Sequence, residues 1–156
     1  MHEEFLRFTD NLASKFEALV GQTPATNGVL PASFRGSGVY LFSENGKRLY
    51  VGRTRDVRKR YGEHTRPSSG DKKAPFAFKL ARHATGFITS NYRPGEMSRA
   101  GLMLNRVFAL AFSESLERVR NMEFRFIEEV DPTRQCLLEI YVSVVCRTPY
   151  NDFNTT

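Results

Sequence analysis

Residues 38–52 read GVYLFSENGKRLYVG, with two short runs rich in Val, Leu and Tyr on either side of residues 44–46. Runs of this composition around a turn signal predict a β-hairpin that carries one tyrosine on each strand. A two-residue turn would place Tyr40 and Tyr50 on opposite faces, whereas a three-residue loop over 44–46 would place them directly opposite each other. Only the second register separates the phenols from the aliphatic side chains, so we predict the three-residue loop. Aromatic pairs across a hairpin also occur simply because they stabilise it.

The next segment predicts a helix from about Asp56, a suitable N-cap residue, to His64. One stripe of this helix combines apolar with ionisable residues at helical spacing: Val57, Arg60, Tyr61 and His64. Burying an arginine is unfavourable unless the charge is paired. Arg60 therefore predicts a nearby carboxylate or a phosphate partner. The plainer alternative is an arginine at the edge of the stripe beside a hydrogen-bonded His64.

A last helix is predicted from Asp131-Pro132, an N-cap followed by proline at the first helical position, to Cys146. This helix is apolar nearly all round and is therefore expected to be buried. Its polar residues recur every four positions in one narrow stripe: Gln135, Glu139, Ser143 and Arg147. The stripe either faces water or lines a groove in which Glu139 meets a cation, because a desolvated carboxylate stays charged only beside a metal ion or an arginine.

The remaining pattern completes an α+β chain, which we expect to form a single domain over residues 1–156. Helices are predicted over 3–20, 76–83 and 115–121, and a strand is predicted over 122–126. A loop or arm is expected over 22–36, a polar loop over 65–73 and an irregular stretch over 85–95. The segment 102–112 fits either a strand or a helix. The predicted fold is a small three-stranded antiparallel central sheet flanked by helices, with an extra N-terminal helix. Its parts are the N-terminal helix and arm (1–36) and a core (37–151) with an insertion at about 67–121.

Basic residues are concentrated between Lys47 and Arg66. Eight basic and two acidic residues give this segment a charge of +6, equal to the net charge of the whole chain. A concentrated patch dominated by arginine predicts a polyphosphate partner, although a solvated basic face gives the same pattern. The candidates for contact with a DNA backbone are Lys47, Arg48, Arg53, Arg55, Arg58, Lys59 and Arg66.

The chain has no run of eighteen apolar residues, and its acidic start does not fit a signal peptide. Cys136 and Cys146 lie ten positions apart in one predicted helix. That spacing is about 15 Å along the helix axis, which exceeds the reach of a disulfide. Neither cysteine has a metal-ligating neighbour. We therefore expect a protein of the reducing cytoplasm with no membrane partner; a homo-oligomer is compatible with the sequence.

Together these pieces resemble the GIY-YIG nuclease superfamily. Its N-terminal motif is matched by Gly38-Val39-Tyr40, by Tyr50-Val51-Gly52, by Arg60 eight residues later and by His64 four residues after that. Glu139, followed twelve residues later by Asn151, is similar to the C-terminal half of the motif in restriction-type members. Glu128 and Glu129 near the third strand are the alternatives to Glu139. The resemblance covers about residues 36–66 and 122–151.

The resemblance implies a metal-dependent endonuclease that hydrolyses double-stranded DNA with one Mg²⁺ or Mn²⁺ ion per site, in restriction, anti-phage defence or repair. The residues implied as catalytic are Tyr40, Tyr50, Arg60, His64, Glu139 and Asn151, with Glu139 as the metal ligand. Arg60 would bind the scissile phosphate or orient the attacking water. Tyr40, near His64, would hold or deprotonate that water, while Tyr50 and Asn151 would position the phosphate or metal-bound water. The alternatives are a non-catalytic DNA-binding module of the same fold and an interaction domain that binds no nucleic acid.

Overall fold

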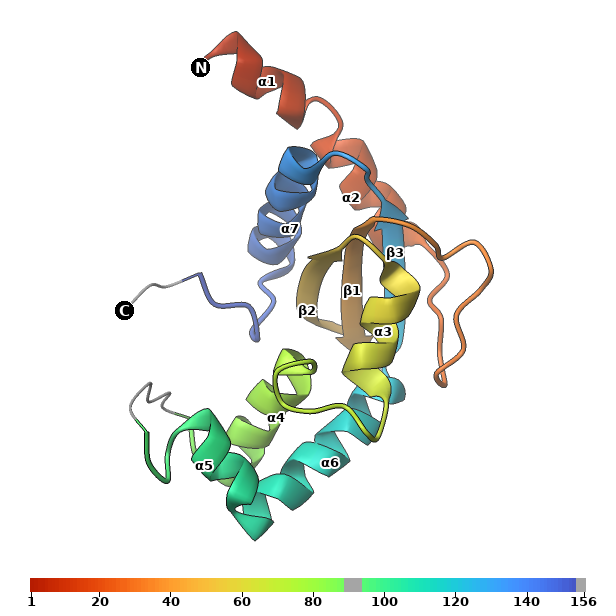
Figure 1. Ribbon diagram of the computed structural model, residues 1–156. Helices are drawn as coiled ribbons and strands as arrows, with labels where there is room; N and C mark the ends of the chain where they lie inside the picture. The colour runs from red at the N-terminus through yellow and green to blue at the C-terminus, as the bar shows by residue number, and fades with distance from the viewer. Residues whose placement is uncertain (89–93, 154–156) are drawn as a thin grey trace. The chain divides into compact units, whose positions relative to one another are not determined.

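The computed structural model describes residues 1–88 and 94–153, which form a three-stranded antiparallel sheet and seven helices (Figure 1). In chain order the elements are α1 (Glu3–Thr9), α2 (Leu12–Gly21), β1 (Gly38–Glu44), β2 (Lys47–Thr54), α3 (Val57–Thr65), α4 (Pro75–Thr85), α5 (Arg99–Leu104), α6 (Arg106–Arg120), β3 (Glu123–Glu128) and α7 (Pro132–Cys146). The sheet and its helices confirm the predicted α+β class. Within the described ranges, no helix is long and apolar enough to cross a membrane.

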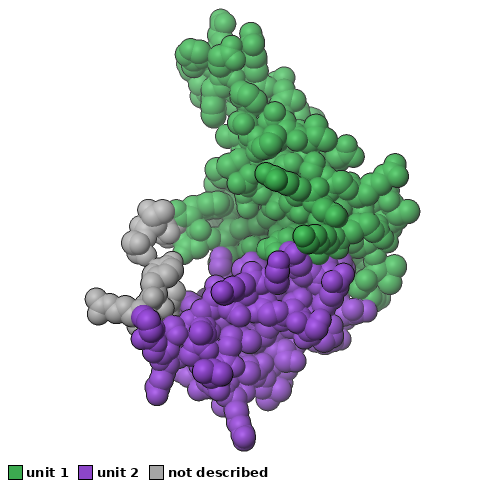
Figure 2. All heavy atoms as spheres, in the orientation of Figure 1, with its two compact units in different colours: residues 1–60, 122–156 green, residues 61–121 purple. Residues whose placement is uncertain are grey.

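The chain is divided between two compact units (Figure 2). The first unit consists of residues 1–60 and 122–156 and contains the whole sheet. The second unit consists of residues 61–121. Helix α3 crosses the boundary, because its first turn belongs to the first unit and the rest to the second.

One face of the sheet is aliphatic and packs against α2 and α7. Strand β1 lies between β2 and β3, and side chains alternate between the two faces. The buried side chains of this layer are Phe16, Leu19, Val39, Leu41, Val51, Leu138 and Val142. Full burial of one such side chain stabilises the fold by about 1.5–3 kcal/mol. This layer therefore fixes α7, which carries Glu139, against the sheet.

The other face of the sheet is aromatic. Phe42 and Phe124 have ring centroids 4.9 Å apart, and Tyr40 stacks on Phe124 at 5.7 Å. Phe34 covers this face from the arm that precedes β1, with its ring 5.9 Å from that of Phe126. Tyr40 is thus held by rings on neighbouring strands.

The arm before β1 also covers the outer edge of β3. Ala25 and Phe124 exchange two backbone hydrogen bonds of 2.8 and 2.9 Å, which form an isolated antiparallel bridge. The side-chain oxygen of Gln22 accepts a hydrogen bond of 2.8 Å from the backbone N–H of Phe126. The predicted extended arm is therefore present, and it occupies the position of a partial fourth strand.

The hairpin register differs from the predicted one. Tyr40 lies opposite Gly52, and Phe42 lies opposite Tyr50. The prediction that Tyr40 lies directly opposite Tyr50 is therefore wrong. The two tyrosines are still on the same face of the sheet, because they are diagonal neighbours two residues out of register.

A β-bulge explains why the predicted register is wrong and why Tyr40 and Tyr50 still lie on the same face of the sheet. The hairpin has a two-residue turn, in which Asn45 (φ 51°) and Gly46 (φ 78°) are both left-handed, as a type I′ turn requires. The register then shifts between Phe42 and Ser43, which leaves Leu49 as an extra residue in β2. Without that extra residue, the two-residue turn would have put the tyrosines on opposite faces.

The N-terminal helix is interrupted, contrary to the single helix predicted over 3–20. Helix α1 ends at Thr9 and α2 begins at Leu12, and no residue of α1 is buried. The guanidinium of Arg134, near the start of α7, donates a hydrogen bond of 2.9 Å to the carbonyl oxygen of Arg7. Helix α1 thus contributes no buried residue, and this hydrogen bond is one of its contacts with α7.

Helix α7 begins and ends as predicted but is not buried all round. The carboxylate of Asp131 caps it by accepting a hydrogen bond of 2.8 Å from the backbone N–H of Arg134. On its outer side, however, Ile140, Val144 and Val145 are 42%, 66% and 51% exposed. The expectation of a fully buried helix is wrong because only one side of α7 packs against the sheet.

The second unit is helical and has its own aromatic contacts. The ring of Phe78 in α4 lies 5.0 Å from that of Phe108 in α6. Arg99 in α5 places its guanidinium 4.1 Å from the Phe78 ring centroid while it pairs with Asp71 at 2.9 Å. The segment 102–112, which fitted strand or helix, is helical, interrupted at Asn105, which caps α6.

The other helices of this unit match the sequence-based expectations. The segments 76–83 and 115–121 lie in α4 and at the end of α6. The irregular stretch expected over 85–95 includes residues 89–93, which lie outside the described residues.

Candidate active site

Tyr40 lies in the middle of β1 and is only 2% exposed. Its phenol crosses the backbone of Gly52, because a Cβ atom added at residue 52 would be 2.3 Å from the phenol oxygen. A glycine is therefore required on the neighbouring strand for the tyrosine to take this position. Burial raises the pKa of the Tyr40 phenol well above its ordinary value, and the nearby charge of Arg60 lowers it only in part. The hydroxyl is thus a neutral hydrogen-bonding group at neutral pH.

Arg60 is directed at this phenol by the first turn of α3. Asp56 caps the turn by accepting a hydrogen bond of 3.2 Å from the backbone N–H of Lys59. Val57, fully buried, anchors the turn with a backbone hydrogen bond of 3.0 Å to Gly36. From this position the Nε of Arg60 donates a hydrogen bond of 3.3 Å to the Tyr40 hydroxyl. One partner of the half-buried Arg60 is therefore a phenol, and the predicted carboxylate or phosphate partner stays a prediction.

Tyr50 on β2 belongs to the same group of side chains. Burial raises the pKa of the Tyr50 phenol, while the charge of Arg60 and a hydrogen bond from Arg60 lower it. Glu139 raises the pKa of both phenols through its negative charge. Two phenols, one guanidinium and one carboxylate are therefore close enough to influence one another electrostatically.

Glu139 reaches this group from α7, across the edge of the sheet. Its Oε2 lies 3.3 Å from the Nε of Arg53 on β2. Burial raises the pKa of the Glu139 carboxyl, and the opposing effect of Arg53 is smaller. Because its side chain is 22% exposed, the carboxylate is partly desolvated yet remains accessible.

The two alternative carboxylates near β3 have other surroundings. Glu129 is buried, and its Oε1 accepts a hydrogen bond of 3.1 Å from the backbone N–H of Asp131. Its Oε2 accepts one of 3.3 Å from Asn11 in the N-terminal region. Glu128 is exposed at the end of β3. Glu139 is the one of the three that acts on the pKa of Tyr40 and Tyr50.

Asn151 binds the protein backbone at the free edge of β2. Its side-chain oxygen accepts a hydrogen bond of 2.9 Å from the backbone N–H of Val51, and its side-chain N–H donates one of 2.8 Å to the carbonyl of the same residue. Beside it, the N–H of Tyr150 donates to the carbonyl of Leu49 at 3.2 Å. Asn151 thus fixes the C-terminal segment to the strand that carries Tyr50.

His64 follows Arg60 by one helical turn on α3. It is fully buried, as the predicted stripe requires. Val57 and Tyr61 are buried on the same stripe, whereas Arg58 and Lys59 are exposed. The helix face was therefore predicted correctly. His64 is counted in the second unit, so its part in the site remains a prediction of the motif.

The segment that contains these tyrosines, Arg60 and Glu139 matches one known domain. A family model described as the GIY-YIG catalytic domain matches residues 36–150, which is most of the chain. The chain belongs to the GIY-YIG family. Comparison with curated proteins and with solved structures returned no match. Membership of the GIY-YIG family makes the chain a nuclease-type protein.

The basic residues predicted to contact DNA occupy different surroundings in this GIY-YIG domain. Arg58 has a structural role, because its Nη1 donates hydrogen bonds of 3.0 and 2.9 Å to the carbonyl oxygens of Pro31 and Phe34. Arg53 is paired with Glu139. The others are exposed: Lys47, Arg48, Arg55, Lys59 and Arg66. Two contacts could not be recognised from the sequence. They are the ion pair between Arg53 and Glu139 and the packing of the Tyr40 phenol against the backbone of Gly52.

The oxygen atoms that the GIY-YIG site offers as ligands are compatible with a hard cation that keeps part of its water shell. Among residues 1–88 and 94–153, no group of three or more His, Cys, Asp or Glu side chains is arranged to hold a metal ion. Mg²⁺ often binds through one or two carboxylates and keeps several water and phosphate ligands. The half-buried carboxylate of Glu139, beside neutral phenol oxygens, fits that type of site. Glu139 is the residue that would hold such an ion.

Proposed function

We propose that the chain is a metal-dependent endonuclease that hydrolyses a phosphodiester bond of double-stranded DNA. The observation that carries the proposal is the convergence of Arg60, Tyr40, Tyr50 and Glu139, with a hydrogen bond of 3.3 Å between Arg60 and Tyr40. A fixed guanidinium next to neutral hydroxyls is suited to an anionic, oxygen-rich reacting group such as a phosphate. The match to the GIY-YIG catalytic domain supports this reading.

Each group has a role that follows from its surroundings. Arg60 binds the scissile phosphate through its guanidinium, which also contacts Tyr40. Tyr40, kept neutral by burial, orients the attacking water through its hydroxyl, and Tyr50 positions the phosphate from the neighbouring strand. Glu139 would hold a Mg²⁺ or Mn²⁺ ion, which when bound would supply Lewis-acid stabilisation of the charge on the leaving oxygen.

Two further residues complete the proposed machinery. Asn151 acts as a positioning residue, because both polar atoms of its amide bind Val51, next to Tyr50. For His64, one helical turn after Arg60 on α3, the motif alone supports a catalytic role, as a group that accepts a proton during hydrolysis.

The direct test is a time course of nicking of supercoiled plasmid with Mg²⁺, with Mn²⁺ and with EDTA. We expect cleavage with either metal, none with EDTA, and strongly reduced rates from Arg60→Ala or Tyr40→Phe protein purified in parallel, by about 10²–10³ for Arg60→Ala. DNA binding in EDTA without cleavage under any metal condition would instead identify a non-catalytic DNA-binding module. A defined ladder of fragments from a sequenced plasmid would favour restriction-type cleavage, and preference for branched or damaged DNA would favour repair.

A further inference from the structure

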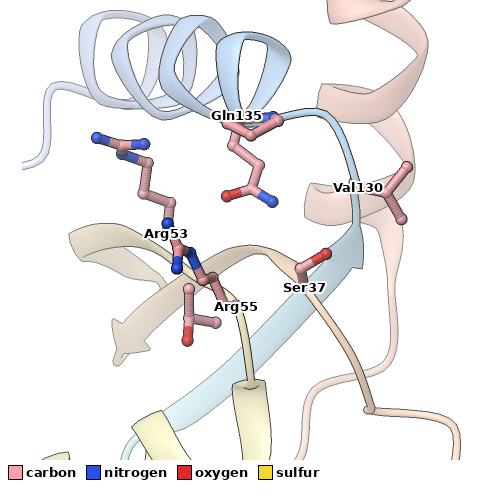
Figure 3. Close-up of a pocket in the computed structure, with 7 residues that line it drawn as sticks. Ser37, Arg53, Arg55, Val130 and Gln135 are labelled. Carbon is pink, nitrogen blue, oxygen red and sulfur yellow. The ribbon is translucent and has the colours of Figure 1, made fainter.

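The first unit contains a pocket that the proposed chemistry does not use. It lies where β2 ends and α7 begins, and it has a volume of about 570 Å³. Its lining residues are Ser37, Arg53, Thr54, Arg55, Val130, Pro132 and Gln135. Figure 3 shows that Arg53 and Arg55 come from the end of β2, whereas Gln135 enters from α7 above them. Residues far apart in the sequence thus form one concave surface.

The charge of this pocket is positive. Two of its seven lining residues are arginines, and none is acidic. Arg55 is exposed and makes no ion pair with any residue that the structure describes, so its charge is not neutralised. Arginine binds oxyanions through paired N–H groups, which makes phosphate and carboxylate its usual partners.

Two polar side chains that line the pocket, Gln135 and Ser37, are fixed in place. The side-chain N–H of Gln135 donates a hydrogen bond of 2.5 Å to the carbonyl of Glu129, and the Ser37 hydroxyl donates to the same carbonyl at 3.3 Å. Gln135 is 5% exposed, so its position is set by packing. The carboxylate of Glu129 instead accepts hydrogen bonds from Asn11 and from the backbone of Asp131. It therefore does not line the pocket, where it would repel an anion.

Arg53 connects this pocket to the proposed active site. Arg53 is one of the residues that line the pocket, and its Nε lies 3.3 Å from Oε2 of the Glu139 carboxylate. An anion held by Arg53 and Arg55 would thus be next to Glu139 without occupying the position of the phosphate bound by Arg60. On a DNA strand, the group that satisfies this condition is a phosphate that flanks the scissile one.

We propose that this pocket is a subsite for a backbone phosphate flanking the scissile phosphate of bound DNA. The subsite sets the register of the strand against the reacting groups, because phosphate contacts fix position without reading sequence. This inference rests on the proposed function. The pocket would recognise a phosphate oxyanion, and free inorganic phosphate carries the same group as the DNA backbone. Free phosphate is therefore the alternative ligand.

The test measures binding to uncleaved duplexes in EDTA, with Arg55→Ala and with Arg7→Ala as the matched control. Arg7 is an exposed arginine on α1 that pairs with Glu4 and does not line the pocket. A series of duplexes carries one methylphosphonate each, which removes the charge of a single phosphate. A parallel calorimetric titration uses inorganic phosphate alone.

For Arg55→Ala we expect a loss of about tenfold in affinity for unmodified DNA, typical of one charge-assisted contact, and a salt slope smaller by about 1. On duplexes with the methylphosphonate at one particular flanking position, wild-type and Arg55→Ala protein should bind with equal affinity. Arg7→Ala should show neither the loss of affinity nor the smaller salt slope. Equal effects of the two substitutions, or a loss from Arg55→Ala that no methylphosphonate removes, would overturn the subsite. Binding of inorganic phosphate without that coupling to DNA would also overturn it, in favour of a site for free phosphate.

The failure of the subsite and the failure of the proposed function give different results. If wild-type protein cleaves plasmid but the coupling is absent, only the subsite is wrong. If wild-type protein does not bind duplex DNA at all, the proposed function itself is wrong.

Discussion

Arg60 and Lys59 are adjacent in the chain but have opposite surroundings. Arg60 is half-buried and donates to Tyr40, whereas the Lys59 side chain is exposed. We expect Arg60→Ala to lower the cleavage rate by about 10²–10³, the usual effect of losing one preorganised donor in the transition state. Lys59→Ala should mainly reduce the salt slope of DNA binding by about 1. Single-turnover cleavage rates and binding titrations at several salt concentrations distinguish the two effects.

The control for that comparison is Arg60→Lys, which keeps the charge but loses the planar donor pair. We expect its rate to lie between those of the wild type and Arg60→Ala. Equal rate losses from Lys59→Ala and Arg60→Ala would contradict the assignment of Arg60 to the inward stripe.

We expect the charged carboxylate of Glu139 to lower the free energy of unfolding at neutral pH. Because burial raises its pKa, the folded protein binds a proton at this carboxyl more readily than the unfolded chain does. The stability of the wild type should therefore fall as the pH rises through the folded pKa. Glu139→Gln removes this dependence, so the variant should be more stable than the wild type at neutral pH and equally stable below about pH 4. Urea denaturation at both pH values measures the difference.

The same variant tests the metal site. Glu139→Gln should lose cleavage and lose calorimetric Mn²⁺ binding, while DNA binding in EDTA is kept or becomes slightly tighter. Retained cleavage, with activity lost instead in Glu128→Gln or Glu129→Gln, would move the metal site to the third strand. Lower stability than the wild type at neutral pH would show that the ion pair with Arg53 outweighs the cost of burial.

At the residue scale, the sequence indicated the candidate groups of the site but not their partners. The helical spacing of Arg60 and His64 was enough to predict the inward face of α3. The pairing of Glu139 with Arg53 could not be predicted, because it depends on how α7 lies against the edge of β2. A glycine inside a strand is in general compatible with the close approach of another group, but the sequence does not say which group. Only the register shows that the neighbour of Gly52 is Tyr40.

At the scale of elements, the hairpin turn depends on one left-handed glycine. Gly46 has φ 78°, and an added Cβ would meet nothing within 4 Å, so only backbone strain opposes a side chain there. Gly46→Ala should therefore lower the free energy of unfolding by about 1 kcal/mol. Gly21→Ala is the matched control, because its Cβ also meets nothing within 4 Å and its φ is not in the positive range. The control should be neutral or slightly stabilising. Urea denaturation of both variants checks this, and equal losses would contradict the role of φ.

The elements that could be predicted are those with strong local signals. Asp131-Pro132 and Asp56 mark the starts of α7 and α3 because capping is a local interaction. The extra residue Leu49 and the break between α1 and α2 depend on tertiary packing, so the pattern alone did not reveal them. The exposed side of α7 was missed for the same reason, since nothing local distinguishes Val144 from the buried Val142.

At the scale of the whole molecule, helix α3 links the two compact units. It runs without interruption from residue 57 to residue 65 across the boundary at residues 60 and 61. Because unfolding either unit would disrupt this shared helix, we expect one cooperative transition, as the sequence-based prediction of a single domain requires. Urea unfolding followed by far-ultraviolet circular dichroism and by tyrosine fluorescence should give coincident curves. Two separated midpoints would show that the units unfold independently.

The covered edges of the sheet have a consequence for behaviour at high concentration. A three-stranded sheet has two edges at which a second chain could add a strand and begin aggregation. Here Asn151 and Tyr150 bind the outer backbone of β2, and Ala25 binds that of β3. Removing residues 148–156 should therefore increase light scattering on standing, even if the remaining chain folds. The segment that carries Asn151 would then also keep neighbouring molecules apart.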